Sequence, residues 1–133
     1  MKEEKAIEWF LRISLSIGFL SAVADRFGFW GTTLSAWGNW ESFAKYCNTL
    51  LPFVSYETAS LLGGVATFLE VVFAFLLLTH FKTDLIAKFS GSLLLTFGLM
   101  MVFALNVKAP LDYSVFTASA AAFALSILAK NNS

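Results

Sequence analysis

Residues 56–81, YETASLLGGVATFLEVVFAFLLLTHF, form a long apolar stretch with one carboxylate, Glu70, near the middle. About 20 mainly apolar residues are enough for a helix to cross a bilayer, so this stretch predicts a transmembrane span. An ionisable side chain inside such a span is costly, which makes Glu70 a candidate functional residue. Its helix face carries small side chains typical of close helix contact in lipid: Ala59, Gly63, Ala66, Thr67 and Ala74.

The composition of the 133-residue chain agrees with one membrane domain, residues 1–133. Hydrophobic residues make up 58% of the chain and charged residues 14%, whereas roughly 25% of the residues in soluble proteins are charged. The nine basic and nine acidic residues cancel, so the chain lacks the basic field that nucleic-acid binding needs. These numbers favour the lipid bilayer as a partner and exclude nucleic acid.

Three further apolar stretches accompany residues 56–81, at about residues 7–27, 85–106 and 113–129. Together they predict an all-α integral membrane four-helix bundle. The alternative for the first stretch is a signal peptide, because Ala22, Val23 and Ala24 resemble a cleavage site. We expect a retained helix instead, because acidic residues precede the stretch and Arg12 interrupts it. Its expected packing face carries small residues and an acid: Ser14, Gly18, Ser21, Ala22 and Asp25.

The segment from residue 28 to residue 55 is too polar to span a membrane. Its tryptophans, glycines and alternating charges predict an interfacial helix or a re-entrant segment between the first two spans. The expected apolar face of this segment consists of Trp40, Phe43, Ala44 and Cys47. Ser55 is the expected N-cap of the second span, and Thr83 or Asp84 that of the third.

Four spans place both termini on one side of the membrane, and the positive-inside rule identifies that side. Five lysines lie with the termini and the turn near residue 82, namely Lys2, Lys5, Lys82, Lys88 and Lys130. Three basic residues lie on the other side, namely Arg26, Lys45 and Lys108. We therefore expect both termini in the cytoplasm.

Arg12 is the expected partner of Glu70. At about 1.5 Å per residue, Glu70 lies roughly 15 Å and Arg12 roughly 8 Å from the cytoplasmic ends of their helices. A long arginine side chain covers this difference, so the sequence predicts an ion pair between them. Such a pair either fixes helix packing or orients a polar ligand group, and Glu70 could also carry a proton.

A second group of polar and aromatic residues is expected near the outer ends of the spans. This outer polar cluster consists of Asp25, Arg26, Glu57, Lys108, Asp112, Trp30, Trp37 and Trp40. Mixed charges beside aromatic rings would suit a polar headgroup above an apolar cavity. The alternative is that these charges are ordinary interfacial residues, with Asp112 capping a helix and Lys108 extending toward water.

Cys47 and His80 are the only residues of their types, and the expected topology puts them on opposite sides of the membrane. They cannot form a catalytic dyad within one chain. One histidine and one cysteine also cannot build a metal cluster or a bis-histidine haem site. The sequence therefore offers no catalytic residues and no metal ligands, and an autonomous enzyme is not expected.

Several stretches resemble the DoxX-like family of small four-helix bacterial membrane proteins. They are LRISLSIGFLSAVADRFGFWG at residues 11–31, ATFLEVVFAFLLL at residues 66–78, WGNWESF at residues 37–43 and KAPLDYSVF at residues 108–116. On this resemblance Arg12 and Glu70 match the first-span arginine and second-span glutamate of the family. Many relatives have lysine where this chain has Arg26.

The resemblance implies a bacterial inner-membrane protein associated with quinone-linked oxidation or oxidative stress. The first hypothesis is therefore an accessory subunit with a redox partner, binding a quinone or lipid-like ligand near Arg12 and Glu70. The alternative is a non-enzymatic assembly factor or structural subunit whose buried charges fix helix packing. A small transporter is a third hypothesis, although the chain shows no pair of broken helices. The sequence leaves open whether the chain forms a homo-oligomer.

Overall fold

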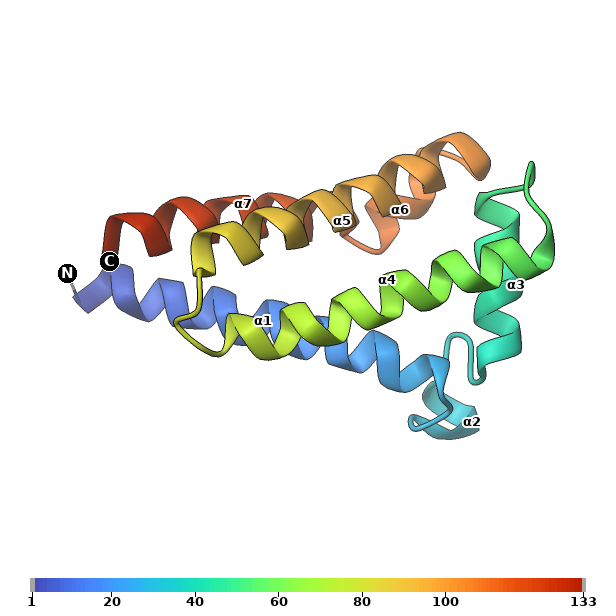
Figure 1. The fold of residues 1–133 in the computed structure, drawn as a ribbon, viewed down its shortest axis with the longest axis horizontal. Helices are drawn as coiled ribbons and strands as arrows, with labels where there is room; N and C mark the ends of the chain where they lie inside the picture. Colours follow the sequence, from blue (N-terminus) through green and yellow to red (C-terminus); the bar gives the residue numbers. More distant parts are fainter. Residues whose placement is uncertain (1, 133) are drawn as a thin grey trace.

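The computed structural model describes residues 2–132, and these fold into seven helices without a strand (Figure 1). The four long helices are α1 (Lys2–Arg26), α4 (Tyr56–Leu77), α5 (Thr83–Ala104) and α7 (Val115–Asn132). The three short ones are α2 (Gly31–Leu34), α3 (Trp40–Leu50) and α6 (Lys108–Asp112). The prediction of an all-α fold is confirmed.

The four long helices pack along one another. Helix α1 contacts α4 and α7, and α5 contacts α4 and α7. The two ends of the chain lie at the same end of the molecule, whereas α2, α3 and α6 lie toward the other end (Figure 1). Helix α3 crosses α4 there and also contacts α1 and α5. Helix α3 lies within residues 28–55, the segment for which the sequence predicts an interfacial helix or a re-entrant segment.

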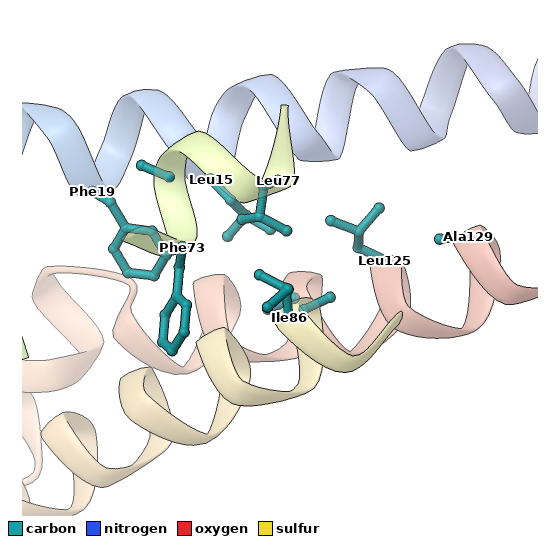
Figure 2. Packing of buried hydrophobic residues seen from close by; sticks show 10 residues of the cluster. Leu15, Phe19, Phe73, Leu77, Ile86, Leu125 and Ala129 are labelled. Atoms are coloured by element: carbon teal, nitrogen blue, oxygen red, sulfur yellow. The ribbon is translucent and has the colours of Figure 1, made fainter. Parts of the chain in front are cut away.

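An apolar core joins the four long helices. Figure 2 shows side chains from all of them meeting in this core, namely Leu15, Phe19, Phe73, Leu77, Ile86, Leu125 and Ala129. A second apolar cluster lies between α3 and α4, where Phe43, Cys47 and Ala59 are buried together. Most of the outer surface of the long helices is also apolar, with Phe103 and Phe68 among many exposed large hydrophobic side chains. An apolar outer surface is expected where lipid replaces water as the surrounding medium.

Within residues 2–132, three helices are long and apolar enough to cross a membrane: α1, α4 and α5. These three helices indicate a membrane protein. Helix α7 has 18 residues, and its last turn consists of the polar Lys130, Asn131 and Asn132. That polar turn shortens the apolar part of α7. By length and composition α7 is therefore not among the helices that are apolar enough to cross a membrane.

The expected helix starts are correct at one position and wrong at another. The hydroxyl of Ser55 accepts a hydrogen bond from the backbone N–H of Thr58 at 3.2 Å and so caps α4 as predicted. Helix α5 instead begins after Lys82, which is left-handed (φ 43°) and makes no side-chain cap. Thr83 and Asp84 are therefore in the first turn of α5 and are not its N-cap. Helix α4 ends at Leu77, so the chain turns earlier than the predicted span of residues 56–81 implied.

The buried faces confirm one packing prediction and correct another. Helix α4 buries Ala59, Gly63, Thr67, Glu70 and Ala74, which is the predicted face. Helix α1 does not bury the predicted face, because Ser14 and Gly18 are exposed. It buries the larger side chains Arg12, Leu15 and Phe19 instead, together with Ser16. The predicted apolar face of α3 is present, with Phe43, Ala44 and Cys47 buried and Trp40 packed against them.

Adjacent glycines in α4 give a matched test of the contact between α3 and α4. A Cβ atom at Gly63 would lie 2.9 Å from Sγ of Cys47 and 3.1 Å from the ring of Phe43, both buried. A Cβ atom at Gly64 would meet only the Trp40 ring at 3.9 Å. We expect Gly63→Ala to lower the free energy of unfolding by about 1–3 kcal/mol through overpacking. We expect Gly64→Ala to be neutral or up to about 1 kcal/mol stabilising, because alanine favours helices.

Unfolding of the two variants in mixed detergent micelles measures this difference. Equal effects of Gly63→Ala and Gly64→Ala would contradict the close approach of α3 to Gly63.

Candidate functional site

Glu70 forms an ion pair with Arg26, the last residue of α1. Nη1 of Arg26 donates to Oε2 of Glu70 at 2.7 Å, and Nη2 donates to Oε1 at 3.2 Å. Both side chains are about 95% buried, with exposed fractions of 4% and 5%. Two parallel N–H···O bonds are the strongest arrangement available to an arginine and a carboxylate. The pair joins the end of α1 to the middle of α4.

Other side chains close the space around Arg26. Its Nη1 atom also donates to the hydroxyl of Thr67 at 2.8 Å, and that hydroxyl donates to the carbonyl of Gly63. The guanidinium carbon lies 4.0 Å from the ring centre of Phe43 and 5.4 Å from that of Trp37. Such cation–π contacts stabilise a cation that has left water. Arg26 is thus held by α3 and α4 together, while its buried Nε lacks a hydrogen-bond partner.

Asp25 holds the loop that carries Trp37. Its carboxylate accepts hydrogen bonds from the backbone N–H groups of Ala36 at 2.9 Å, Trp37 at 3.2 Å and Gly38 at 3.2 Å. Three donors satisfy a buried carboxylate without a cation. Asp25 and Arg26 therefore have different contacts at the end of α1. Asp25 positions the loop, and Arg26 binds α4.

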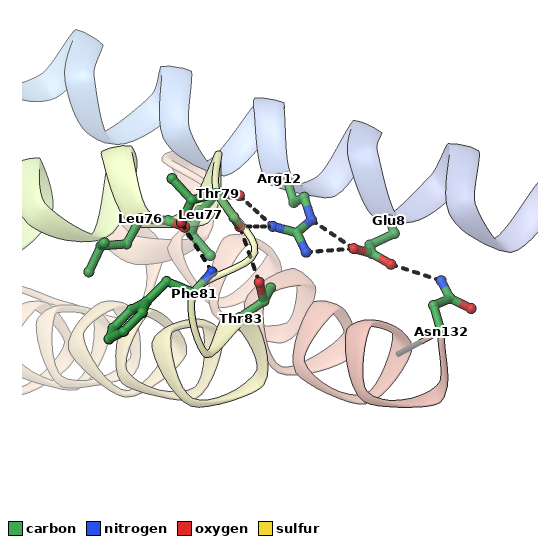
Figure 3. A network of polar contacts seen from close by, with 8 residues as sticks. All are labelled: Glu8, Arg12, Leu76, Leu77, Thr79, Phe81, Thr83 and Asn132. Atoms are coloured by element: carbon green, nitrogen blue, oxygen red, sulfur yellow. Dashed lines mark hydrogen bonds and ion pairs between the residues drawn. The ribbon is translucent and has the colours of Figure 1, made fainter.

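The predicted ion pair between Arg12 and Glu70 is wrong. Nε and Nη2 of Arg12 each lie 2.7 Å from Oε2 of Glu8, one turn earlier in α1. Its Nη1 donates to the carbonyls of Leu77 at 2.8 Å and Thr79 at 2.6 Å, where α4 ends (Figure 3). The carbonyls at a helix C-terminus lack intrahelical partners, and Arg12 satisfies that of Leu77. The carbonyl of Thr79 lies in the turn after α4 and also accepts a hydrogen bond from the hydroxyl of Thr83 at 3.3 Å.

The longitudinal offset of α1 explains why the prediction failed. The depth estimate assumed that the first two spans begin and end at the same levels. In the structure Arg12 reaches the end of α4, and the hydroxyl of Ser16 reaches the carbonyl of Ala74. Arg26 then lies near the middle of α4 and meets Glu70, so the second arginine of α1 takes the role assigned to the first.

The predicted outer polar cluster is divided. Lys108 and Asp112 pair with each other at 2.5 Å within α6, and both are exposed. Helix α6 contacts α5 and α7 but not α1, among the described residues. Asp25 and Arg26 are buried, and Trp37 lies over Arg26 as described. Trp40 instead donates from its indole N–H to the hydroxyl of Ser60 at 3.1 Å and stacks on Phe27, while Glu57 and Trp30 are exposed.

Sequence reasoning missed three polar partners at the end of the bundle where the termini lie. Glu8 binds Arg12 and also accepts a hydrogen bond from Asn132 of α7 at 2.9 Å. The spacing of Glu8 and Arg12 by four residues is a recognisable signal for such a pair. The carbonyl of Thr79 and the side chain of Asn132 carry no comparable signal, because both depend on tertiary packing.

Cys47 lies in the apolar cluster between α3 and α4, and it is a free thiol. Burial raises its pKa to about 11, with Arg26 lowering and Glu70 raising it by smaller amounts. At pH 8 the thiolate fraction is therefore about a hundredfold lower than for a thiol at the ordinary value of 9.0. A thiol in this state is a poor nucleophile.

We expect alkylation of Cys47 by iodoacetamide to be at least about a hundredfold slower at pH 8 than that of an exposed thiol, because thiolate is the reactive form. The rate should rise about tenfold per pH unit up to pH 11. Mass spectrometry of the intact chain measures the rate. A rate that levels off near pH 9 would show that the thiol is not buried as described. The Gly63→Ala variant should react faster, because it separates α3 from α4.

No group of three or more histidine, cysteine, aspartate or glutamate side chains that could hold a metal ion occurs within residues 2–132. Cys47 in α3 and His80 in the turn after α4 lie at opposite ends of the molecule. The buried groups that the structure brings together are thus an ion pair at Glu70 and an arginine-centred network at Arg12.

No family model, no curated protein and no solved structure matches the chain.

Proposed function

We propose that the protein is an accessory or assembly subunit in a membrane, and that its buried charges fix helix packing. The observation that supports this proposal is the closed pair of Arg26 and Glu70. Both oxygens of Glu70 accept hydrogen bonds from Arg26, and Thr67, Phe43 and Trp37 occupy the space around the guanidinium. A substrate or a proton carrier would have to displace Arg26 before it could reach Glu70.

The proposal includes four membrane spans, with α7 as the fourth. Helix α7 packs along α5, which is apolar enough to span by itself. Residues 115–129, the 15 residues before its polar last turn, give an apolar length of about 23 Å, against about 30 Å for a bilayer core, so the end with Lys130 would lie at the headgroup level. The ends of the chain lie at the same end of the bundle as the turn between α4 and α5, which contains Lys82. The positive-inside rule then favours cytoplasmic termini. The resemblance to the DoxX-like family supports the inner membrane of a bacterium.

The resemblance to the DoxX-like family extends the proposal to a quinone-linked redox or oxidative-stress system. A quinone carbonyl accepts hydrogen bonds, so a quinone site needs donors that are free to bind it. The carboxylate of Glu70 has no donor when it is paired with Arg26. Arg26 directs its Nη atoms to Glu70 and Thr67, so only its Nε is left without a partner, and Phe43 and Trp37 pack against that guanidinium. These residues do not fit a quinone at Glu70. We therefore assign quinone binding and electron transfer to a partner subunit.

Site-specific photo-crosslinking in native membranes tests the accessory function. A crosslinking residue is placed at Phe29, which is 79% exposed in the loop after α1. The matched control is Phe103, which is 86% exposed in the last turn of α5. We expect the Phe29 position to capture one membrane-bound redox subunit, identified by mass spectrometry, and the Phe103 position to give mainly lipid adducts.

The Arg26→Met/Glu70→Leu double variant completes this test. If the pair only fixes packing, the double variant folds and captures the same subunit from the Phe29 position. Loss of capture in a folded double variant would contradict the structural role of the pair. Turnover of a quinone by the purified chain alone would contradict the accessory function.

A further inference from the structure

A cavity of about 500 Å³ lies at the end of the bundle that holds both ends of the chain. It results from the offset between the helices. Because Arg12 binds the carbonyls at the end of α4, about ten residues of α1 precede that level and extend about 15 Å beyond it. Helix α7 extends in the same direction, and Asn132 in its last turn binds Glu8. The turn between α4 and α5 closes the space between these two helix ends.

Basic side chains outnumber acidic ones around this cavity. Four basic side chains line it, namely Lys5, Arg12, Lys82 and Lys130, against two acidic ones, Glu8 and Asp84. Glu8 is already bound by Arg12 and Asn132. The cavity therefore keeps an excess of positive charge, and Lys5 and Lys82 are exposed to an incoming ligand.

An aromatic side chain completes the wall of the cavity. The guanidinium carbon of Arg12 lies 4.9 Å from the ring centre of Trp9, and the ring of His80 meets Trp9 edge-on at 5.8 Å. The guanidinium of Arg12 is thus held by Glu8, by the carbonyls of Leu77 and Thr79, and by the ring of Trp9. Tryptophan beside lysine at the end of an apolar helix is typical of the level where lipid headgroups lie.

We propose that this cavity binds a phosphate group, carried either by the headgroup of an anionic phospholipid or by free phosphate. Lysine ammonium groups bind phosphate oxygens as point charges, and basic pockets between transmembrane helices on the cytoplasmic side bind anionic headgroups. Its volume is in the range of about 300–1,000 Å³ usual for small-ligand sites. The inference rests on the membrane placement in the proposed function, but it does not need the accessory role or a partner subunit.

Charge at this end of the bundle could also attract anions without a site, and the chain offers a matched control. Lys2 and Lys88 lie at the same end but do not line the cavity, and both are exposed. The Lys5→Gln/Lys82→Asn variant removes two cavity charges, with asparagine chosen because it tolerates the left-handed backbone of residue 82. The Lys2→Gln/Lys88→Gln variant removes the same charge outside the cavity.

Native mass spectrometry of the full chain in neutral detergent measures binding. The chain is titrated with phosphatidylglycerol, with zwitterionic phosphatidylcholine and with inorganic phosphate. Each lysine near an anionic group contributes about 1 kcal/mol, or about a fivefold change in Kd. We expect the cavity variant to raise the Kd for phosphatidylglycerol about 30-fold, and the control variant to change it less than about threefold. Phosphatidylcholine should bind more weakly than phosphatidylglycerol.

The titrations also separate the two sources of the phosphate. Competition by inorganic phosphate supports a soluble phosphate ligand, whereas binding of phosphatidylglycerol without such competition supports a lipid headgroup. Equal weakening by the two double variants would overturn the proposal, because it would show diffuse attraction. Absence of binding by both phosphatidylglycerol and inorganic phosphate would also overturn it. If the cavity variant fails to fold, Lys5→Gln alone should still weaken binding about fivefold.

Discussion

Replacing Arg26 by methionine is expected to lower the free energy of unfolding by about 3 kcal/mol, because it leaves a buried carboxylate without its cation. Glu70 loses both of its hydrogen-bond donors, and Thr67 loses the donor to its hydroxyl. The cation–π contacts of Arg26 with the rings of Trp37 and Phe43 are also lost. Unfolding in mixed detergent micelles measures the change.

The double variant Arg26→Met/Glu70→Leu is the matched control for this prediction. It removes both charges and keeps apolar side chains of similar length, so no unpaired group stays buried. Replacement of a whole buried ion pair by apolar residues is often neutral or stabilising. We expect the double variant to unfold within about 1 kcal/mol of the wild-type chain. A double variant that is less stable than Arg26→Met would contradict the account.

Replacing Arg12 by methionine is expected to cost about 2 kcal/mol, because the carbonyl of Leu77 loses its donor and that of Thr79 keeps only the hydroxyl of Thr83 at 3.3 Å. Glu8 keeps its hydrogen bond from Asn132, and Thr79 is exposed, so water can replace part of the loss. The effect should therefore be smaller than that of Arg26→Met. Backbone amides in the turn between α4 and α5 should also exchange faster with solvent, because Arg12 links this turn to α1.

Lys88→Met serves as the control for Arg12→Met. It removes one positive charge from an exposed position of α5 at the same end of the molecule. An exposed substitution usually changes stability by less than about 0.5 kcal/mol. Equal effects of the two changes would show that the carbonyl contacts of Arg12 do not stabilise the end of α4.

The buried face of α4 could be predicted from the sequence because helical periodicity is a local property. Small residues recur along one side of the apolar stretch, and the structure buries Gly63, Thr67, Glu70 and Ala74 there. The N-cap at Ser55 follows from the hydroxyl directly before the helix. Both features depend on residues that are close in the chain.

The partner of Glu70 could not be predicted because it depends on how far α1 slides along α4. A shift of one helical turn moves a side chain by about 5.4 Å, which is enough to change its partner. The prediction of which side of α1 is buried is wrong for a related reason. Small residues such as Gly18 suggested a close-packing face. Helix α1 instead buries Arg12, which binds the carbonyl of Leu77 in α4, and Phe19, which is part of the core joining the four long helices. Periodicity alone does not distinguish a small-residue face toward lipid from one toward a helix.

The cavity at the end of the bundle has the same origin. Lys5 and Lys82 are distant in sequence, and the lysine count predicted only the side of the membrane on which they lie. The offset of α1 and α7 beyond the turn between α4 and α5 brings them to one space. The offset thus determines both the partner of Glu70 and the site proposed for phosphate.

A pair of double-mutant cycles tests the central claim, that Arg26 and not Arg12 holds Glu70. The first cycle combines Arg26→Met with Glu70→Leu, and the second combines Arg12→Met with Glu70→Leu, all measured by unfolding in mixed micelles. We expect a coupling energy of about 2 kcal/mol or more in the first cycle, and less than about 0.5 kcal/mol in the second. Strong coupling between Arg12 and Glu70, with additive effects of Arg26 and Glu70, would contradict the account.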